Sequence, residues 1–167
     1  MMADGRLRLA GLAALVVLVL DQVTKAIVLG TMTLYQSIDV LPIFALTYLR
    51  NTGAAFGILA AAPAGLRLPL FFVVTAVAVG ALISFVRQTA PEERVVVAAL
   101  GGILGGAIGN LVCRVRYGEV IDFLDVHWGG LHWPPFNVAD SAITVGVAVV
   151  LLHGLRGTRR AERGSVV

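Results

Sequence analysis

The stretch GGILGGAIGN, residues 101–110, decides how this chain packs. Five of its ten residues are glycine, and its only polar side chain belongs to the last residue, Asn110. Small residues at this spacing allow neighbouring helices to approach closely within a membrane. We therefore predict that the stretch belongs to a membrane-spanning helix that packs tightly against its neighbours and carries one polar group near its end.

The composition of the whole chain is typical of an integral membrane protein. Its 167 residues are 58% hydrophobic and only 14% charged, whereas a soluble domain carries about a quarter charged residues. The length fits one domain, residues 1–167. The chain has one lysine and no basic patch interleaved with aromatic residues, which excludes a nucleic-acid-binding protein. Its one cysteine, Cys113, excludes an internal disulfide and a multi-thiolate zinc site.

Four apolar segments are long enough to cross a bilayer, which takes about 20 residues each. They are residues 7–29, 68–86, 95–112 and 138–155. The first resembles a secretory signal, because Arg6 and Arg8 precede its hydrophobic core. No A-x-A cleavage pattern follows, so we expect this segment to be retained as a helix.

The arginines indicate how the four spans are oriented. Short cytoplasmic loops are enriched in Lys and Arg, and the side that holds both termini carries the larger share of arginines. We therefore predict a multi-pass protein with both termini in the cytoplasm and a disordered polar tail over residues 157–167. The terminal side carries Arg6, Arg8, Arg87, Arg94, Arg156, Arg159, Arg160 and Arg163, and the other side carries Arg50, Arg67, Arg114 and Arg116.

Two segments are predicted to lie outside the cytoplasm. Residues 31–66 contain the β-branched runs YQSIDV and FALTYLR, which predict a small sheet on the membrane surface. Residues 113–137 are predicted to form a loop with a short helix, and Trp128 and Trp133 favour the headgroup region. Gly129 and Gly130 make this loop a candidate lid. The predicted fold class is thus a mainly α membrane protein with four transmembrane helices and a small extracytoplasmic β-sheet.

The polar residues within the spans fall at one depth. Given the predicted topology, each of them lies in the outer leaflet, where an unsatisfied polar group costs several kcal/mol. Unrelated structural groups would have no reason to share a level, so we expect these residues to meet. An acid and a lysine four residues apart can also pair on one helix face, which would be a purely structural role. The residues are Asp21, Lys25, Asn110 and Asp140.

Asp122 is a further carboxylate in an apolar setting, between Ile121 and Phe123 just beyond the third span. An aspartate in such a place is usually a cap or a salt-bridge partner, and Asp125 has the same two possibilities. If the chain folds back to bring Asp122 beside Asp140, the two acids would share a proton and titrate as a pair. One could then act as a base on water while the other donates to a peptide carbonyl.

Four motifs, in this order on a four-span chain, resemble the lipoprotein signal peptidases, the bacterial type II signal peptidases, over nearly the whole chain. They are DQVTK (21–25), NTGAAFGIL (51–59), GAIGNLVCRVRYGEVIDF (106–123) and FNVADSAITVG (136–146). The resemblance implies an aspartic endopeptidase of the bacterial cytoplasmic (inner) membrane whose site lies near the outer leaflet. Such enzymes cut the signal peptide from prolipoproteins just before a diacylglyceryl-modified cysteine.

The resemblance also implies roles for individual residues. Asp122 and Asp140 would be the catalytic dyad, with Asp140 the base because the helix N-terminus favours its charged form. Asp21 and Lys25 would be mainly structural. We expect no cofactor and no metal, a monomeric enzyme, and partners limited to prolipoprotein substrates and membrane lipid. Residues that would support the site or contact substrate are Asn51, Gly53, Asn110, Arg114, Asn137 and Ala139.

One position departs from the family pattern. The family usually reads G-N-x-x-D-R where this chain has GNLVCR, so Cys113 replaces an aspartate that would pair with Arg114. We expect Arg114 to pair with Glu119 or Asp125 instead. A thiol nucleophile at Cys113 is an alternative, although no motif ties it to a histidine.

Other chemistries and functions stay open at this point. Ser141 and Lys25 could form a serine–lysine site, but a serine in the first turn of a helix is more simply a hydrogen-bonding residue. The histidines, at 127, 132 and 153, lack the spacing of metal ligands. A small proton-coupled transporter would more often place acids near the midplane. A non-catalytic assembly subunit would explain the glycines but would leave Asp122 and Asp140 without a purpose.

Overall fold

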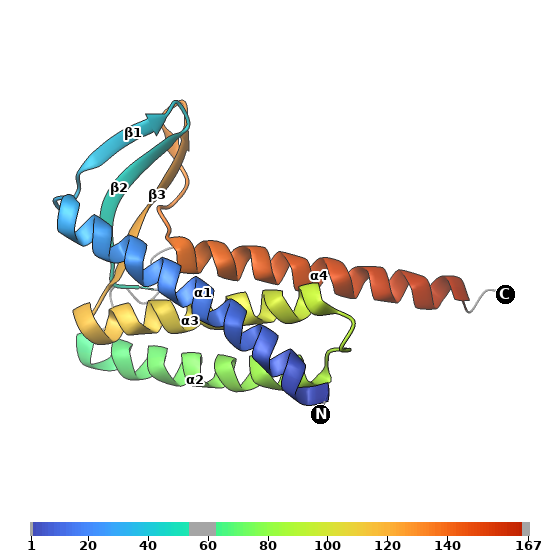
Figure 1. Ribbon diagram of the computed structural model, residues 1–167. Coiled ribbons are helices and arrows are strands. Elements are labelled where there is room, and N and C mark those ends of the chain that lie inside the picture. The colour runs from blue at the N-terminus through green and yellow to red at the C-terminus, as the bar shows by residue number, and fades with distance from the viewer. Residues whose placement is uncertain (1, 54–62, 165–167) are drawn as a thin grey trace.

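The computed structural model describes residues 2–53 and 63–164 of the chain. It contains four long helices and four strands (Figure 1). Each helix contains a segment long and apolar enough to cross a membrane, so the four predicted spans and the predicted fold class are confirmed. The helices are α1 (Met2–Thr31), α2 (Ala64–Gln88), α3 (Arg94–Tyr117) and α4 (Val138–Gly164).

Helix α3 packs against the three other helices, and its glycines allow the closest approaches. A Cβ added at Gly101 or Gly105 would overlap the backbone of α1 at Ala10 or Ala14. At Gly106 it would lie 2.5 Å from the carbonyl oxygen of Ala139 in α4. The predicted role of this glycine-rich stretch in close helix packing is therefore confirmed.

The strands form one antiparallel sheet in the order β1-β2-β3-β4. Strand β2 pairs with β3 so that Leu49 faces Asp122 and Asn51 faces Val120. The register shifts by one residue between Leu46 and Leu49, which is a β-bulge in β2. The strands are β1 (Ser37–Leu41), β2 (Phe44–Asn51), β3 (Val120–Trp128) and β4 (Leu131–His132).

The sheet differs from the prediction in its third and fourth strands. The sequence predicts a loop with a short helix over residues 113–137, but these residues hold the end of α3 and then the β3–β4 hairpin. The run VIDFLDVHW is mostly apolar, and β3 buries its first half against β2 and the helices. A buried strand without strict alternation cannot be told from other apolar segments by its pattern alone.

Two helices extend beyond the predicted spans. Helix α3 continues past residue 112 to Tyr117, and α4 continues to Gly164 instead of giving way to a disordered tail at Gly157. Hydropathy marks only the apolar part of a helix. Good helix formers such as Arg, Ala and Glu continue the backbone hydrogen bonding after the strongly apolar part ends.

The sheet lies at one end of the helices, and its strands run across the helix axes (Figure 1). The end of α1, the end of α3 and the start of α4 lie at this end of the molecule, whereas α1 begins and α4 ends at the opposite one (Figure 1). This arrangement brings the end of β2, the first half of β3 and three helix ends together. Most of the predicted motif NTGAAFGIL, residues 54–59, lies outside the described residues.

Candidate active site

A cavity of about 1090 Å³ lies where the sheet meets α3 and α4. Asp122 of β3 and Asp140 of α4 both line it, so the fold brings together two carboxyl groups that the sequence places on separate elements. The other polar lining residues include Asn51, Asn110 and Arg114. The apolar part of the lining includes Leu49, Val120, Trp133, Phe136, Ile143 and Val145.

Asp122 is buried, with 3% of its surface exposed, and both of its carboxyl oxygens accept hydrogen bonds. The side-chain amide of Asn137 donates to Oδ1 at 2.7 Å, and that of Asn51 donates to Oδ2 at 3.2 Å. Burial, followed by the nearby charge of Asp140, raises the pKa of Asp122 to about 6, although the two amides favour its charged form. This carboxyl group therefore holds its proton at a higher pH than an ordinary aspartate.

Asp140 lies in the first turn of α4, where Asn137 caps the helix. The side-chain oxygen of Asn137 accepts the backbone N–H of Asp140 at 3.0 Å, which satisfies one of the free amides of the first turn. The side-chain amide of Asn110 donates to Oδ1 of Asp140 at 2.7 Å. The helix end thus fixes the position of this carboxylate, and α3 supplies its hydrogen-bond donor.

Two amides connect the two acids. Asn137 donates to Asp122 and also lies within hydrogen-bond distance of Asn110, with 3.3 Å between Nδ2 of Asn137 and Oδ1 of Asn110. Lys25 donates to the same Oδ1 at 2.9 Å. Because an ammonium group can only donate, it fixes which end of the Asn110 amide turns toward Asp140.

The predicted ion pair in α1 is present and joins this network. Nζ of Lys25 lies 2.9 Å from Oδ2 of Asp21, and both side chains are buried. The other oxygen of Asp21 accepts the backbone N–H of Ala139 at 3.0 Å. Asp21, Lys25, Asn110 and Asp140 therefore meet, as their common depth in the sequence predicts.

Arg114 holds the turn that follows β2. Its guanidinium donates to the carbonyl of Gly53 at 2.7 Å and to that of Asn110 at 3.4 Å, and it lies over the ring of Phe71 with 4.0 Å to the centroid. Within the same turn, the N–H of Gly53 donates to the side-chain oxygen of Asn51 at 2.9 Å. Arg114 thereby supports the residue that contacts Asp122.

The predicted ion pair of Arg114 with Glu119 or Asp125 is wrong, because both acids have other partners. Among the described residues Glu119 pairs with Arg50 at 3.9 Å, and Asp125 binds His132 at 2.9 Å. Glu119 lies just before β3 and Asp125 lies within it, and both point toward partners in the sheet. The carbonyl of Gly53 accepts a hydrogen bond from Arg114 in place of these two acids, and the ring of Phe71 lies against the guanidinium.

The alternative nucleophiles make other contacts. Cys113 is fully buried, and its sulfur accepts a hydrogen bond from Gln22 at 3.6 Å. His127 stacks on His132, with 5.0 Å between ring centroids, and His153 binds Glu93 at 2.9 Å. None of these contacts joins a histidine to the thiol.

The other alternative sites are also not assembled. The hydroxyl of Ser141 donates to the carbonyl of Asn137 at 2.9 Å. Ser141 is thus a hydrogen-bonding residue of the first helical turn, the simpler of the two roles that the sequence allows. Lys25 donates to Asp21 and Asn110. Within residues 2–53 and 63–164, no group of three His, Cys, Asp or Glu side chains is placed to hold a metal ion.

Two contacts of the site were not predicted from the sequence. Phe71 lies in an apolar span and carries no signal that distinguishes it from its neighbours, so its contact with Arg114 could not be foreseen. Gln22 follows Asp21 in the motif DQVTK, and its polarity within a span is a signal. Its amide contacts Asp21 at 3.0 Å and the carbonyl of Gly109 at 3.1 Å.

Known proteins resemble this chain in sequence. The sequence model of signal peptidase (SPase) II matches residues 13–156. A lipoprotein signal peptidase of Geobacter sulfurreducens is 53% identical over 144 residues, 86% of this chain and 89% of the relative. One of Syntrophotalea carbinolica is 51% identical over 146 residues, 87% of this chain and 89% of the relative.

Solved structures show the same fold. A bacterial membrane enzyme structure obtained by the in meso method at 2.3 Å resolution is 37% identical, with a TM-score of 0.80 over 89% of this chain and 88% of that one. A second, at 1.9 Å resolution, is also 37% identical, with a TM-score of 0.76 over 87% of this chain and 92% of that one. The chain belongs to the signal peptidase (SPase) II family, an aspartic-type family of membrane peptidases.

Proposed function

We propose that this chain removes signal peptides from diacylglyceryl-modified prolipoproteins, with Asp122 and Asp140 as a catalytic dyad that activates water. The observation that carries the proposal is the shared cavity, in which two acids from separate elements are joined through the amides of Asn110 and Asn137. Membership of a peptidase family leaves the transporter and assembly-subunit alternatives without support.

The dyad would work as a proton-sharing pair. Two acids that face one cavity do not ionise independently, so one carries a proton while the other is charged. The raised pKa of Asp122 supports its role as the protonated partner. The N-terminus of α4 favours the charged form of Asp140, which supports its role as the base.

The reaction would proceed without a covalent enzyme intermediate. The Asp140 carboxylate takes a proton from water, the water oxygen bonds to the scissile carbonyl carbon, and Asp122 donates its proton to the carbonyl oxygen. The C–N bond of the resulting diol then breaks. Asp140 passes its proton to the leaving amine, and Asp122 recovers one from the diol, which restores the starting state of both acids.

The neighbouring residues would hold this geometry in place. Asn110 and Asn137 position one carboxyl group each, while Lys25 and Asp21 keep Asn110 and the start of α4 in place. Catalysis by preorganised groups depends on such fixed hydrogen bonds. These residues would therefore act by positioning the dyad.

The surroundings of the cavity suit a lipid-modified peptide. Its lining combines the polar centre with apolar side chains from β2, β3 and α4. The lipid chains of a modified cysteine are held in the bilayer, so a site near the outer leaflet would meet the cleavage point at the right depth. We infer a monomeric, single-domain enzyme with both termini in the cytoplasm of a bacterial cell, without cofactor or metal.

The decisive experiment measures cleavage of a diacylglyceryl-modified precursor by the purified Asp122→Asn and Asp140→Asn variants. Asp39→Asn is a matched control, because Asp39 is exposed on β1 of the same sheet. We expect both dyad variants to lose turnover while they keep their fold, and the control to retain it. Near-wild-type turnover in either folded dyad variant would disprove the aspartic mechanism. A flat pH profile between acid and neutral pH would also argue against a dyad.

A further inference from the structure

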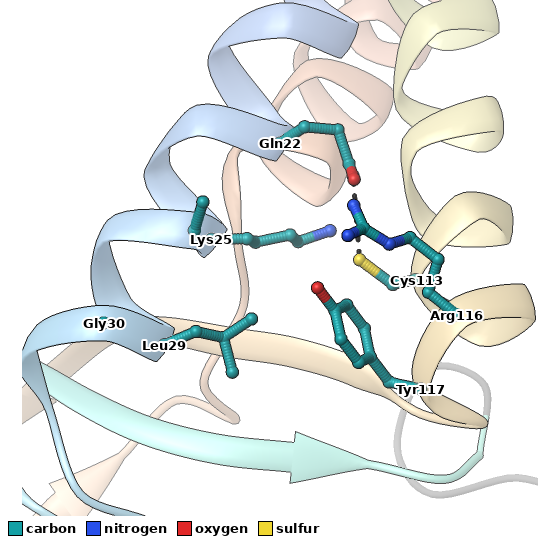
Figure 2. A pocket seen from close by; sticks show the side chains of 8 residues that line it. Gln22, Lys25, Leu29, Gly30, Cys113, Arg116 and Tyr117 are labelled. Carbon is teal, nitrogen blue, oxygen red and sulfur yellow. Dashed lines mark hydrogen bonds between the residues drawn. The ribbon is translucent and has the colours of Figure 1, made fainter.

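A second cavity, of about 330 Å³, lies between the last turns of α1 and α3, and the proposed reaction does not use it. Figure 2 shows the side chains that line it, with Lys25 from α1 and Arg116 and Tyr117 from α3. Leu29, Gly30 and the buried Cys113 complete much of the wall. No aspartate or glutamate is among the lining residues.

Two positive groups point toward one another across this cavity (Figure 2). The ammonium of Lys25 has three hydrogens, and it donates to Asp21 and to Asn110, so its donors are not all used by these two acceptors. The guanidinium of Arg116 contacts the ring of Tyr117, with 5.3 Å to the centroid. Within the described residues Arg116 forms no ion pair, and its guanidinium group, which lines the cavity, belongs to an exposed side chain.

Asp21 compensates the charge of Lys25, so the guanidinium of Arg116 is the uncompensated positive charge among the described residues of this cavity. A guanidinium is the donor best suited to a phosphate, because its N–H groups match the phosphate oxygens in pairs. The hydroxyl of Tyr117 also points into the cavity and can donate (Figure 2). We propose that this cavity is a binding site for a phosphate group, and that in the membrane its ligand is the phosphodiester of a phospholipid headgroup.

The position of the cavity supports a lipid as the source of the phosphate. The cavity lies at the ends of two membrane-crossing segments, which finish at Thr31 and Tyr117. Lipid phosphates occupy this level of a bilayer. The wall from Leu29 and Gly30 is apolar and suits the glycerol and upper acyl carbons, while the charged wall suits the phosphate.

The C-terminal ends of α1 and α3 carry partial negative charge, which disfavours a bound anion, but this effect is weaker than the attraction by the basic side chain. A helix C-terminus carries about half a negative charge, and such charges are spread over several carbonyl groups. The guanidinium of Arg116 contributes a full positive charge at shorter range, whereas Asp21 compensates the charge of Lys25. Arg116 could instead interact only with the last carbonyl groups of α3. That role would not explain why Arg116 and Lys25 line the same cavity, whereas a phosphate site does.

Two variants test the site independently of peptide cleavage. Arg116→Gln removes the main donor. Gly30→Leu fills the cavity without removing any donor, and a Cβ at Gly30 meets no atom within 4 Å. The matched controls are Arg87→Gln, an exposed arginine at the end of α2, and Gly80→Leu, where an added Cβ also meets no atom within 4 Å.

Binding of phosphatidylglycerol to the detergent-solubilised full chain would be measured by native mass spectrometry, with diacylglycerol of the same chains as the phosphate-free comparison. We expect both test variants to bind phosphatidylglycerol about tenfold more weakly than wild type, and both controls to bind it normally. Diacylglycerol binding should not change. Equal phosphatidylglycerol binding by wild type and by folded Arg116→Gln or Gly30→Leu would overturn the proposal.

A competition experiment separates the two sources of phosphate. Inorganic phosphate added to the wild-type complex should leave phosphatidylglycerol bound, because the lipid also gains contacts with the apolar wall. Displacement by inorganic phosphate that depends on Arg116 would keep the anion site but overturn a lipid as its ligand. Loss of peptide cleavage in the dyad variants has no bearing on either readout.

Discussion

The side-chain amide of Asn137 lies 3.3 Å from the side-chain oxygen of Asn110, and this contact is the middle of a chain that joins the two acids of the cavity. Each amide holds one carboxyl group at 2.7 Å, Asn137 that of Asp122 and Asn110 that of Asp140. Neither acid can shift without disturbing an amide that also contacts the other amide. The pair is therefore held as a unit.

Asn137 has two functions that a substitution can separate. It caps α4 through its oxygen and donates to Asp122 through its nitrogen. Asn137→Ser keeps a good helix cap but has no amide to reach Asp122. We expect its stability to stay within about 1 kcal/mol of wild type. The value of kcat/KM for precursor cleavage should fall roughly 10- to 100-fold, because the lost hydrogen bond favours the charged form that Asp122 takes when it donates its proton.

Asn137→Ala is the companion variant, because it loses the cap as well. Thermal unfolding in detergent should show a lower melting temperature for this variant than for Asn137→Ser. Full turnover in the serine variant would show that the amide contact to Asp122 is not needed for cleavage.

The raised pKa of Asp122 makes stability depend on pH. Between the ordinary value of 3.8 and about 6, the folded state binds more protons than the unfolded state. Stability from this group is therefore full below the ordinary pKa and is lost as the pH rises through about 6. From about pH 4 to about pH 7.5, wild type should lose up to about 3 kcal/mol that Asp122→Asn does not lose.

Melting temperatures of the two proteins at both pH values give this double difference, with Asp39→Asn as the control. Comparing pH values within each protein cancels other effects of the substitution. Parallel pH curves for wild type and Asp122→Asn would mean that Asp122 has an ordinary pKa in the folded protein.

The buried pair of Asp21 and Lys25 should behave as a unit. Lys25→Met leaves an uncompensated charge at Asp21 and should cost about 3–5 kcal/mol. The double variant Asp21→Asn with Lys25→Met removes both charges, so most of this stability should return. Its precursor cleavage should stay low, because Asn110 lacks the lysine that fixes its orientation.

In this series the melting temperature therefore reports charge compensation, and kcat/KM reports the orientation of Asn110. A double variant that regains both would show that the lysine has only the structural role that the sequence allows. A double variant as unstable as Lys25→Met would show that the two charges do not compensate one another.

Gly109 is the glycine of α3 closest to the site. A Cβ at this position would lie 2.6 Å from the carboxylate oxygen of Asp21, whereas one at Gly102 would meet its nearest atom at 4.0 Å. Gly109→Ala should destabilise the protein by about 1–3 kcal/mol through overpacking and should also reduce cleavage by displacing Asp21. Gly102→Ala should be neutral or slightly stabilising, since alanine favours helix. Melting temperatures that fall equally for both would contradict this reading of the packing.

The membrane-spanning part of the fold could be predicted from the sequence because its signals are local. Apolar length marked the four spans, and the alternation of their directions put Asp21, Lys25, Asn110 and Asp140 at one depth. Their contacts follow from this topology once the glycines of α3 bring the helices together.

Contacts made through the sheet could not be predicted in the same way. The contact between Asn51 and Asp122 depends on the register of β3 against β2, which no local sequence pattern predicts. The neighbours of Arg114 are a backbone carbonyl and the ring of Phe71, and neither has a signature in the sequence. The predicted acidic partners of Arg114 were wrong because Glu119 and Asp125 pair with residues of the sheet, and proximity in sequence does not give proximity in space.

The bulge in β2 decides which residues can face the dyad. Before it Leu46 is opposite Leu124, and after it Leu49 is opposite Asp122, so β2 contains one residue more than β3 over this interval. Side chains alternate between faces along a regular strand, so the odd number of steps from Leu46 to Asn51 would put these two side chains on opposite faces. The bulge absorbs the extra residue, so that Asn51 still lies opposite Val120 and on the same face as Asp122. The reach of the Asn51 amide to the dyad therefore depends on an irregular stretch of backbone that precedes it in the strand.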